Sequence, residues 1–263
     1  MPPAPGARRA TATDRKFVSA LARGIEVLRS FGPRDVWLTN QEIARRTGLA
    51  KPTVSRLAYT LTRIGQLRYS EETNKYALGP GAFSVGLCAL GQLDIRRIAR
   101  PLMQALSEHT RAAVHFSMAD RQAIVIVDTY RTSESFVVDI GSRIPMATTS
   151  MGRAWLCALP DAQRRKALDE LRAAHGDEWP QVKKGLDAAF REYEEHGYCL
   201  GLGDWRREVH AGAVPFVPLD GWEPVVFGCS GAAFQLDADA LRTQIAPRLL
   251  ALVGNIRSAL ASE

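Results

Sequence analysis

Residues 38–67 most restrict what this chain can fold into, because they hold two short helical patterns separated by one glycine. The segment is LTNQEIARRTGLAKPTVSRLAYTLTRIGQL. Thr39, followed three residues later by Glu42, forms a capping-box pattern at the start of the first helix, and Gly48 is expected to end that helix at positive φ. The second helix begins near Lys51, with a proline in its first turn, where a missing N–H costs nothing. The segment therefore predicts two helices joined by a tight turn.

The second helix has two faces of different chemistry. Its apolar residues recur at steps of three and four, and we expect them to pack inward: Val54, Leu57, Leu61 and Ile64. A rotation of 100° per residue places a polar stripe on the opposite face: Ser55, Arg56, Tyr59 and Arg63. The stripe contains no carboxylate, so solubility alone does not explain it. Because a helix fits the major groove of B-DNA, where arginine can hydrogen-bond guanine, the stripe indicates DNA recognition.

The preceding helix would hold the second one at a fixed angle, as in a helix-turn-helix. Small and apolar residues at the expected junction support this interpretation: Ile43, Ala44, Gly48, Leu49, Val54 and Leu57. The charge distribution agrees with it. Residues 1–80 hold 14 Lys and Arg against 6 Asp and Glu, a net charge of +8, whereas residues 81–263 hold 20 against 22. The basic N-terminal part is suited to a polyanion, and the remainder is not.

Further elements complete an N-terminal winged helix-turn-helix domain, which we place at residues 16–79. A half-buried amphipathic helix is expected over residues 17–32, on these positions: Phe17, Leu21, Gly24, Ile25, Leu28 and Phe31. Residues 66–79 predict the two strands of a wing. Residues 80–93 predict a linker helix whose glycines permit close packing against a partner. The basic, proline- and alanine-rich residues 1–15 predict a disordered tail.

The rest of the chain, residues 94–263, mixes helices and strands. Helices are expected at residues 94–110, 149–159, 161–173, 181–196 and from Asp237 onward. Strands are expected at residues 112–120, 122–130, 135–141, 198–202, 209–219 and 223–233. Helices mixed with an antiparallel succession of strands predict an α+β fold.

The sequence resembles the IclR family of bacterial transcriptional regulators over about residues 15–262. The most specific stretches are residues 38–67, YSEETNKYALGP at 69–80, TSMGRAWLCALP at 149–160 and HGYCLGLGDWRREVHAGAVPF at 196–216. The resemblance implies a winged helix-turn-helix, a linker helix and a C-terminal effector-binding domain distantly like the GAF and profilin folds. It also implies a repressor or activator that binds double-stranded operator DNA as a homodimer or homotetramer.

The resemblance assigns DNA contacts to residues of the recognition helix and the wing: Lys51, Thr53, Ser55, Arg56, Tyr59, Arg63, Arg68 and Lys75. The two wing residues would meet phosphate or the adjacent minor groove. Phosphate contacts hold the register, whereas base contacts specify sequence. We therefore expect Arg56 to carry specificity and Lys75 to contribute mainly affinity.

The resemblance also implies a pocket for a small organic acid. Its anion site would be the start of a helix, whose free N–H groups favour negative charge, at Ser150, Met151 and Gly152. Across the pocket, the family places groups that match Asp204, Trp205, Cys229 and Ser230. An anion site beside an aromatic wall is suited to a small aromatic or keto acid.

Departures from the family pattern indicate a less polar pocket than in members that recognise very small oxo-acids. Ala147 replaces a frequent histidine, Gly201 and Leu202 replace an acidic pair, and Gly228 replaces a serine. Phe116 and Met118, together with Trp205, favour a larger, more apolar ligand. Ordinary core packing would explain these three residues equally well, and a loop cap would explain Asp204 equally well.

A thiol redox enzyme with an accessory basic domain is the second interpretation, with Cys229 or Cys199 as the reactive thiol. The four cysteines include no C-x-x-C pair, which favours reduced core thiols. Two histidines, His115 and His210, lack metal-ligand spacing with Cys199 and Asp204. The chain has no P-loop, nucleophile elbow or GxGxxG motif. We therefore expect no catalysis, no metal and no cofactor.

A third interpretation, a nonspecific nucleoid binder, conflicts with the large acidic second part. No run of residues approaches the roughly 18 to 20 apolar residues of a membrane span, and the basic start has no apolar segment. We expect a cytoplasmic protein with no membrane partner. The effector, the operator, the direction of regulation and the choice of dimer or tetramer stay open.

Overall fold

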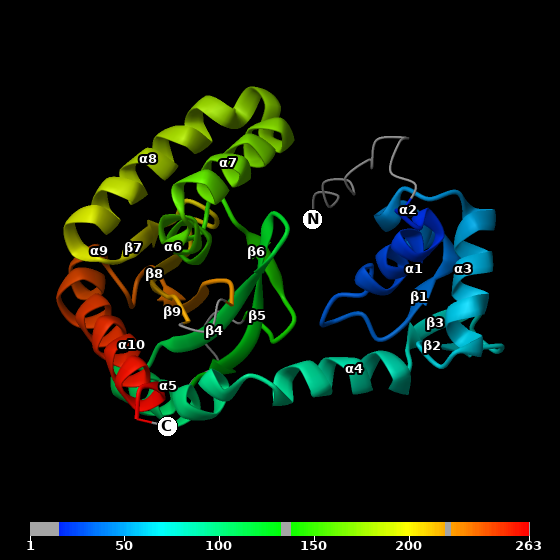
Figure 1. The fold of residues 1–263 in the computed structure, drawn as a ribbon, viewed down its shortest axis with the longest axis horizontal. Coiled ribbons are helices and arrows are strands. Elements are labelled where there is room, and N and C mark those ends of the chain that lie inside the picture. Colours follow the sequence, from blue (N-terminus) through cyan, green and yellow to red (C-terminus); the bar gives the residue numbers. More distant parts are fainter. Residues whose placement is uncertain (1–15, 133–137, 219–221, 263) are drawn as a thin grey trace. The chain divides into compact units, whose positions relative to one another are not determined.

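The computed structural model describes residues 16–132, 138–218 and 222–262 (Figure 1). The chain divides into two compact parts, residues 1–93 and residues 94–263. The predicted disordered tail at residues 1–15 lies outside the described residues.

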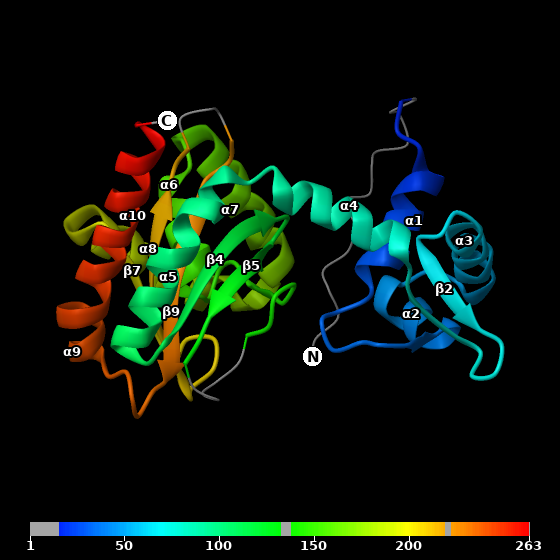
Figure 2. The ribbon, with the colours of Figure 1, turned by 90° about the horizontal axis from the view of Figure 1, so that it is seen from below.

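The N-terminal part is a helix-turn-helix followed by a wing (Figure 2). Its described elements are α1 (Ser19–Arg29), β1 (Leu38–Thr39), α2 (Asn40–Thr47), α3 (Lys51–Arg63), β2 (Leu67–Ser70), β3 (Lys75–Leu78) and α4 (Pro80–Gly91). The strands form an antiparallel sheet in the order β1-β3-β2. The first three helices pack around buried apolar side chains that include Val27, Ile43 and Val54.

The start of α2 and the turn before α3 have the predicted geometry. Thr39 Oγ1 accepts a hydrogen bond from the Glu42 N–H at 3.2 Å, and Glu42 Oε2 accepts one from the Thr39 N–H at 2.8 Å. Gly48 has φ of 71°, and its N–H donates to the Ala44 carbonyl at 2.9 Å. A residue with a Cβ would be strained at this φ. The capping box and the glycine turn are therefore confirmed, and together they set where α3 begins.

The packing of α3 and α1 differs from the prediction in two places. The sequence predicts an inward Ile64, but α3 ends at Arg63, and Ile64 is 62% exposed while Ala58 is fully buried. On α1, the face that packs inward is centred on Gly24 and Val27. Apolar side chains at the predicted half-buried positions are exposed instead: Phe17, Leu21 and Ile25. The other three predicted positions are buried or half-buried, namely Gly24, Leu28 and Phe31, so the prediction is correct for half of this face.

Helix α4 occupies the predicted linker region, and its start lies close to the turn between α3 and β2. A Cβ at Gly79 would lie 2.4 Å from the Gly65 carbonyl oxygen, and a Cβ at Gly81 would lie 2.9 Å from the same atom. These glycines therefore allow close packing within the N-terminal part. A Cβ at Gly86 or Gly91 would meet no atom within 4 Å. Large apolar side chains of α4 are exposed to solvent: Phe83, Val85 and Leu87.

The C-terminal part is built on an antiparallel six-stranded sheet in the order β6-β5-β4-β9-β8-β7. Its strands are β4 (Ala113–Asp120), β5 (Ala123–Tyr130), β6 (Arg143–Pro145), β7 (Cys199–Leu202), β8 (Val209–Phe216) and β9 (Val225–Ala232). Its helices are α5 (Asp94–Thr110), α6 (Ser150–Ala158), α7 (Asp161–His175), α8 (Trp179–His196), α9 (Ala238–Ala240) and α10 (Ala246–Leu260). A 3-10 turn, Gly176–Glu178, precedes α8, and a π-helical turn, Leu241–Ile245, precedes α10.

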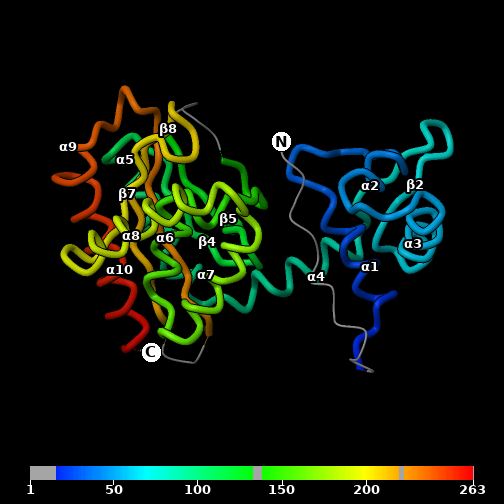
Figure 3. Tube along the Cα trace, turned by 90° about the horizontal axis from the view of Figure 1, so that it is seen from above, coloured from blue at the N-terminus to red at the C-terminus, as the bar shows by residue number. Residues whose placement is uncertain are grey.

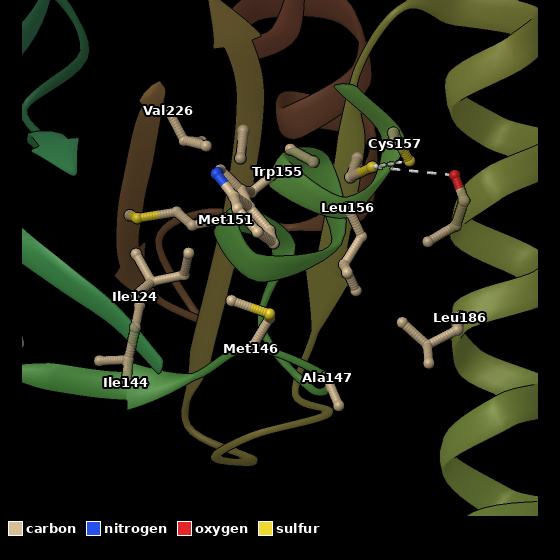
Figure 4. Packing of buried hydrophobic residues seen from close by; sticks show 14 of the residues in the cluster. Ile124, Ile144, Met146, Ala147, Met151, Trp155, Leu156, Cys157, Leu186 and Val226 are labelled. Carbon is tan, nitrogen blue, oxygen red and sulfur yellow. Dashed lines mark hydrogen bonds between the residues drawn. The ribbon is translucent and has the colours of Figure 1, made fainter. Parts of the chain in front are cut away.

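Helices cover both faces of this sheet. Helix α6, with α7 and α8 outside it, lies on one face, and α5 and α10 lie on the other (Figures 1 and 3). Met151 and Trp155 of α6 point toward the strands, whereas Leu156 and Cys157 lie on the side of α8 (Figure 4). On the opposite face of the sheet, the rings of Phe116 and Phe227 stack with their centroids 5.3 Å apart.

A β-bulge in β5 changes the direction of side chains along that strand. The pairing of β4 with β5 skips Val127, which lies between Ile126 and Asp128. Ile126 therefore packs in the core on the α6 face, whereas Asp128 faces α5, where its Oδ2 lies 2.8 Å from Arg96 Nε. Simple alternation would place both residues on one face.

The predicted strand at residues 135–141 is wrong over its described residues, 138–141. Residues 133–137 lie outside the described residues, and residues 138–141 form no strand. A turn occupies this segment, with Gly141 at φ of 81° and the Ser142 N–H donating to the Asp139 carbonyl at 2.9 Å. The edge strand follows the turn as β6.

Candidate functional sites

Helix α3 exposes the predicted polar stripe. Its four members are all exposed to solvent: Ser55, Arg56, Tyr59 and Arg63. Lys51 is also exposed at the start of the helix, and Thr53 is half-buried. No residue of α3 is acidic. An exposed helix that carries positive charge and hydrogen-bonding groups, without a carboxylate, is suited to the phosphate-rich surface of DNA.

Two side chains of α2 also contact exposed polar residues at the start of α3. Asn40 Nδ2 donates to Ser55 Oγ at 2.7 Å, and Lys51 Nζ lies 3.5 Å from Gln41 Oε1. Sequence reasoning missed Asn40, because its partner lies 15 residues away on another helix. Ser55 therefore contributes to the packing of the two helices as well as to the exposed stripe.

The two predicted wing residues have different surroundings. The Arg68 guanidinium carbon lies 5.8 Å from the centroid of the Trp37 ring, so this side chain lies over an aromatic surface. Lys75 is half-buried on β3, where it pairs in register with Thr39. The backbone N–H and the hydroxyl of Thr39 are the main causes that lower the pKa of Glu42, and the positive charge of Lys75 adds to them. The carboxylate of Glu42 is therefore close enough to Lys75 to interact with its positive charge.

A cavity opens in the C-terminal part between the N-terminus of α6 and strands β7, β8 and β9. Its empty volume, which includes the open mouth, is about 420 Å³. The lining is mostly apolar, with a few hydroxyls and one carboxylate: Val138, Ile144, Thr148, Thr149, Ser150, Met151, Gly201, Asp204, Trp205, Val209, Ala211 and Ser230. This combination is typical of a site for a small, partly apolar molecule.

The first residues of α6, Ser150 and Met151, line the cavity. Thr149 caps the helix, since its Oγ1 accepts from the Gly152 N–H at 3.2 Å and donates to the Pro145 carbonyl at 2.7 Å. A Cβ at Gly201 would lie 3.4 Å from the Ser150 nitrogen, so glycine leaves this N–H accessible from the cavity. The first N–H groups of a helix lack intrahelical partners and carry partial positive charge. The geometry therefore favours an anionic group at Ser150.

Asp204 lines the cavity but is paired with a buried arginine. Arg153 Nη1 donates to Asp204 Oδ2 at 3.1 Å, and Arg153 Nε donates to the Ala147 carbonyl at 3.2 Å. The Arg153 side chain is only 7% exposed. Sequence reasoning did not single out Arg153, whose partner is 51 residues away. Asp204 therefore neutralises a buried charge, and the pair adds no net charge to the cavity.

Four predicted effector residues do not line the cavity. Phe116, Met118 and Cys229 lie on the α5 and α10 face of the sheet, because they have the opposite alternation to Ser117 and Ser230. Gly152 packs against the main chain, since a Cβ there would lie 1.9 Å from the Met146 carbonyl oxygen. We correct these four assignments. Five predicted residues do line the cavity: Ser150, Met151, Asp204, Trp205 and Ser230.

The structure also gives a reason for Gly228. A Cβ at this position would lie 2.5 Å from Cε of Met151, whose side chain extends toward the sheet. Met151 is held there by Ser117, whose hydroxyl lies 3.6 Å from the methionine sulfur. The glycine therefore makes space for an apolar side chain that forms part of the cavity wall.

A buried histidine connects the cavity to the middle of the sheet. His115 Nε2 lies 2.9 Å from Ser230 Oγ, and His115 Nδ1 lies 2.9 Å from Thr129 Oγ1. Desolvation by burial lowers the pKa of His115 to about 4. The ring is therefore neutral at neutral pH, with one donor and one acceptor nitrogen. Sequence reasoning considered His115 only as a metal ligand.

Three of the four cysteines, Cys157, Cys199 and Cys229, are buried and poorly placed for thiolate chemistry, whereas Cys88 is exposed on α4. Burial raises the pKa of Cys229 to about 12, and Cys229 is fully buried. Cys157 and Cys199 place their sulfurs 3.7 Å apart in the core, and the hydrogen bond from Cys157 together with burial raises the pKa of Cys199. Because the thiolate is the reactive form, these shifts disfavour a thiol nucleophile. In the part of the chain that is described, no cluster of three or more His, Cys, Asp or Glu could hold a metal ion.

Two known protein domains match this chain. The IclR helix-turn-helix domain matches residues 20–71, and the C-terminal domain of the bacterial transcriptional regulator IclR matches residues 87–252. The chain belongs to the IclR family of transcriptional regulators. The family resemblance and the α+β fold with an N-terminal helix-turn-helix are thereby confirmed.

Individual IclR-family proteins resemble it over nearly the full length. The HTH-type transcriptional regulator TsaQ1/TsaQ2 of Comamonas testosteroni is 32% identical over 246 residues, covering 92% of this chain and 88% of its own. A crystal structure of an IclR-family transcriptional regulator from Brucella abortus is 44% identical, with a TM-score of 0.85 and 95% of each chain covered. An IclR homologue from Microbacterium hydrocarbonoxydans, crystallised with 4-hydroxybenzoate, shares the fold at 20% identity and a TM-score of 0.70, covering 93% of this chain and all of its own. Across the described residues, no helix has the length and apolar character to span a membrane.

Proposed function

We propose that this IclR-family regulator binds a specific operator through α3 and the wing, and that a small organic acid in the C-terminal cavity modulates that binding. The observation that carries the proposal is the exposed stripe of α3, which has arginines, hydroxyls and no carboxylate. The protein would act in the cytoplasm. Family membership supports regulation of transcription, and the stripe and the cavity are the observations that support the finer proposal.

The residues that would meet DNA fall into two groups. Arg56, at the centre of the stripe, would hydrogen-bond a base edge in the major groove, with Lys51, Thr53, Ser55, Tyr59 and Arg63 beside it. Arg68 and Lys75 would contact phosphate or the adjacent minor groove. The wing tip carries two exposed carboxylates, Glu71 and Glu72, which phosphates repel. The wing would therefore approach DNA along its side.

Binding-site selection from a random duplex library, followed by affinity measurements on the selected and a scrambled duplex, tests these roles. Arg56→Ala should lower affinity for the selected duplex about tenfold to a hundredfold and leave the scrambled duplex almost unchanged. Arg68→Ala should weaken both duplexes and reduce the salt dependence. Arg165→Ala, an exposed arginine of α7, is the matched control. Equal loss on both duplexes in Arg56→Ala would contradict the specificity role.

Two features of the cavity, an anion site and an apolar wall, support the proposal that it binds an acid. Backbone N–H groups at Ser150 would hold a carboxylate, and Val138, Ile144 and Trp205 would contact an apolar body. A distant structural relative holds 4-hydroxybenzoate, an acid of this chemistry. An acid that binds one arrangement of the DNA-binding domains more tightly than another would shift the protein toward that arrangement. The resulting change in operator affinity is limited by the ratio of the acid's affinities for the two arrangements.

A thermal-shift panel of aromatic, keto and hydroxy acids is the direct test. A ligand at 100 times its Kd should stabilise the protein by about 2.7 kcal/mol. Gly201→Ala adds a methyl group at ordinary contact distance from the Ser150 nitrogen, so it should preserve the fold and weaken the acid. Gly254→Ala adds a methyl group where no atom lies within 4 Å, and it should bind like the wild type. Equal binding by both variants would contradict the anion site at Ser150.

We further propose that the regulator acts as a homodimer or homotetramer. Exposed apolar side chains on α1, on the two residues before it and on α4 suit a second copy of the chain: Phe17, Val18, Leu21, Ile25, Phe83, Val85 and Leu87. Two recognition helices reading one palindrome about 34 Å apart would need such a pairing.

A further inference from the structure

A hydrogen-bonded row crosses the sheet beneath the cavity, with His115 at its centre. His115 on β4 is 1% exposed, and its two ring nitrogens contact Ser230 on β9 and Thr129 on β5, each at 2.9 Å. Because both nitrogens are engaged, the ring cannot turn without losing a partner. Ser230 also lines the cavity. The row therefore ends where a ligand would lie.

The neutral ring couples the directions of the two hydroxyls. If Nδ1 accepts from the Thr129 hydroxyl, Nε2 donates to Ser230, and the Ser230 proton is left to point elsewhere. In the other tautomer, Ser230 donates to Nε2 and keeps only its lone pairs for another partner. In the first arrangement the Ser230 hydroxyl, which is 4% exposed, can still donate and accept, and in the second it can only accept. A buried polar group with spare capacity costs free energy unless something meets it.

We propose that His115 is a positioning residue that directs the Ser230 hydroxyl into the cavity, and that the cavity consequently selects organic acids that carry a hydroxyl group. A ligand hydroxyl both donates and accepts, so it pairs with Ser230 in either tautomer of His115. A keto oxygen only accepts and suits one of them. A methyl group suits neither. The inference rests on the proposed acid-binding function and adds the chemical class of the acid.

Titration calorimetry of the full-length protein with two isosteric pairs of acids tests the class. The pairs are 4-hydroxybenzoate with 4-methylbenzoate, and 2-hydroxypropanoate with 2-methylpropanoate. In at least one pair, the hydroxy acid should bind about tenfold more tightly than its methyl counterpart, because the methyl group leaves Ser230 without a partner. Equal affinities within every pair that binds, or a preference for the methyl acid, would overturn the inference and leave acid binding intact.

If the proposed acid-binding function were wrong, the calorimetry would give a different result. Should all four acids fail to bind a protein that still binds its selected duplex, acid binding and this inference would both be overturned. The DNA measurement shows that the protein used is folded and active.

Three variants separate positioning by His115 from a merely structural role. Ser230→Ala should reduce the affinity ratio within a pair to about one while preserving the affinity for the methyl acid. Thr129→Val is isosteric, acts at the far end of the row and does not line the cavity, so it should lower the ratio through His115 alone. Ser107→Ala removes a buried hydroxyl of α5 that donates to the Ala112 carbonyl at 2.9 Å, and it should leave the ratio unchanged.

The Thr129→Val result decides the role of His115. A ratio that falls in Ser230→Ala and in Thr129→Val, but not in Ser107→Ala, supports the proposal. A ratio unchanged in Thr129→Val would show that Ser230 acts without direction from His115. If His115 only supported the fold, Thr129→Val would lower the affinity for both acids of a pair equally. The ratio of the two affinities would then stay the same.

Discussion

A single methyl group at position 152 would collide with the main chain. A Cβ there would lie 1.9 Å from the Met146 carbonyl oxygen, whereas a Cβ at Gly86 on α4 would meet nothing within 4 Å. Gly152→Ala should therefore destabilise the C-terminal part by at least about 3 kcal/mol. Gly86→Ala should stabilise α4 by roughly 0.5 to 1 kcal/mol, because alanine loses less backbone entropy in a helix. Hydrogen exchange read peptide by peptide measures both, and a wild-type pattern in Gly152→Ala would contradict the contact.

The buried His115 gives the C-terminal part a characteristic pH dependence. Burial lowers the pKa of His115 to about 4, and an unfolded histidine titrates near 6.5. Between these values the unfolded state binds the extra proton, so stability falls as pH is lowered from 6.5 toward 4, by at most about 1.4 kcal/mol per pH unit. His115→Gln should flatten this part of the profile. Denaturant unfolding of both proteins at pH 5 and pH 7 measures the difference, and equal pH slopes would refute it.

Individual buried residues were predictable only where local spacing decides them. The buried Val54 and Leu61 follow from helix periodicity, as the exposed turn at Gly48 follows from turn chemistry. The pairs His115 with Ser230 and Arg153 with Asp204 join residues 115 and 51 positions apart. No local pattern marks such pairs, because strand order brings their residues together.

At the scale of elements, the capping box of α2 is the best-defined local stabiliser of the DNA-binding part. Thr39→Ala removes the acceptor for the Glu42 N–H and should cost about 1 kcal/mol, whereas Thr39→Ser keeps the hydroxyl and should retain most of the stability. Faster hydrogen exchange confined to peptides of α2 and the following turn is the expected signature. Identical exchange in the alanine and serine variants would show that the hydroxyl does not stabilise α2.

The sequence predicted closely where the helices begin and end along the chain. It did not predict which face of the sheet each strand side chain points to. The helices from α2 to α4 begin and end close to the predicted residues, because caps, glycines and prolines act locally. The directions of side chains on β5 depend on the bulge at Val127, and the face of β4 and β9 that borders the cavity depends on which helix covers it. Phe116, Met118 and Cys229 were therefore assigned to the wrong side of the sheet.

At the scale of the whole molecule, exposed apolar residues on α1 and α4 predict self-association. Leu21→Glu combined with Val85→Glu should convert the protein to monomers in sedimentation velocity. The same variant should bind a palindromic operator at least about a hundredfold more weakly, because the advantage of two linked half-sites is lost. Phe234→Glu, which changes an aromatic residue that is 87% exposed in the C-terminal part, is the control and should keep both properties. A wild-type protein that binds the palindrome as a monomer would contradict the prediction.

The small residues on the floor of the cavity have a consequence for how the ligand specificity of such a regulator can evolve. Gly201, Ala211 and Ser230 are paired across three strands and all face the same space. Backbone pairing does not depend on side-chain size, so a substitution at one of these positions alters the depth or polarity of the floor and keeps the strand register. If the cavity binds an acid as we propose, recognition of a different acid would be reachable by one or two substitutions that leave α3 unchanged. Under that proposal, the same scaffold could diverge quickly in the acid that it binds, or be engineered as a biosensor.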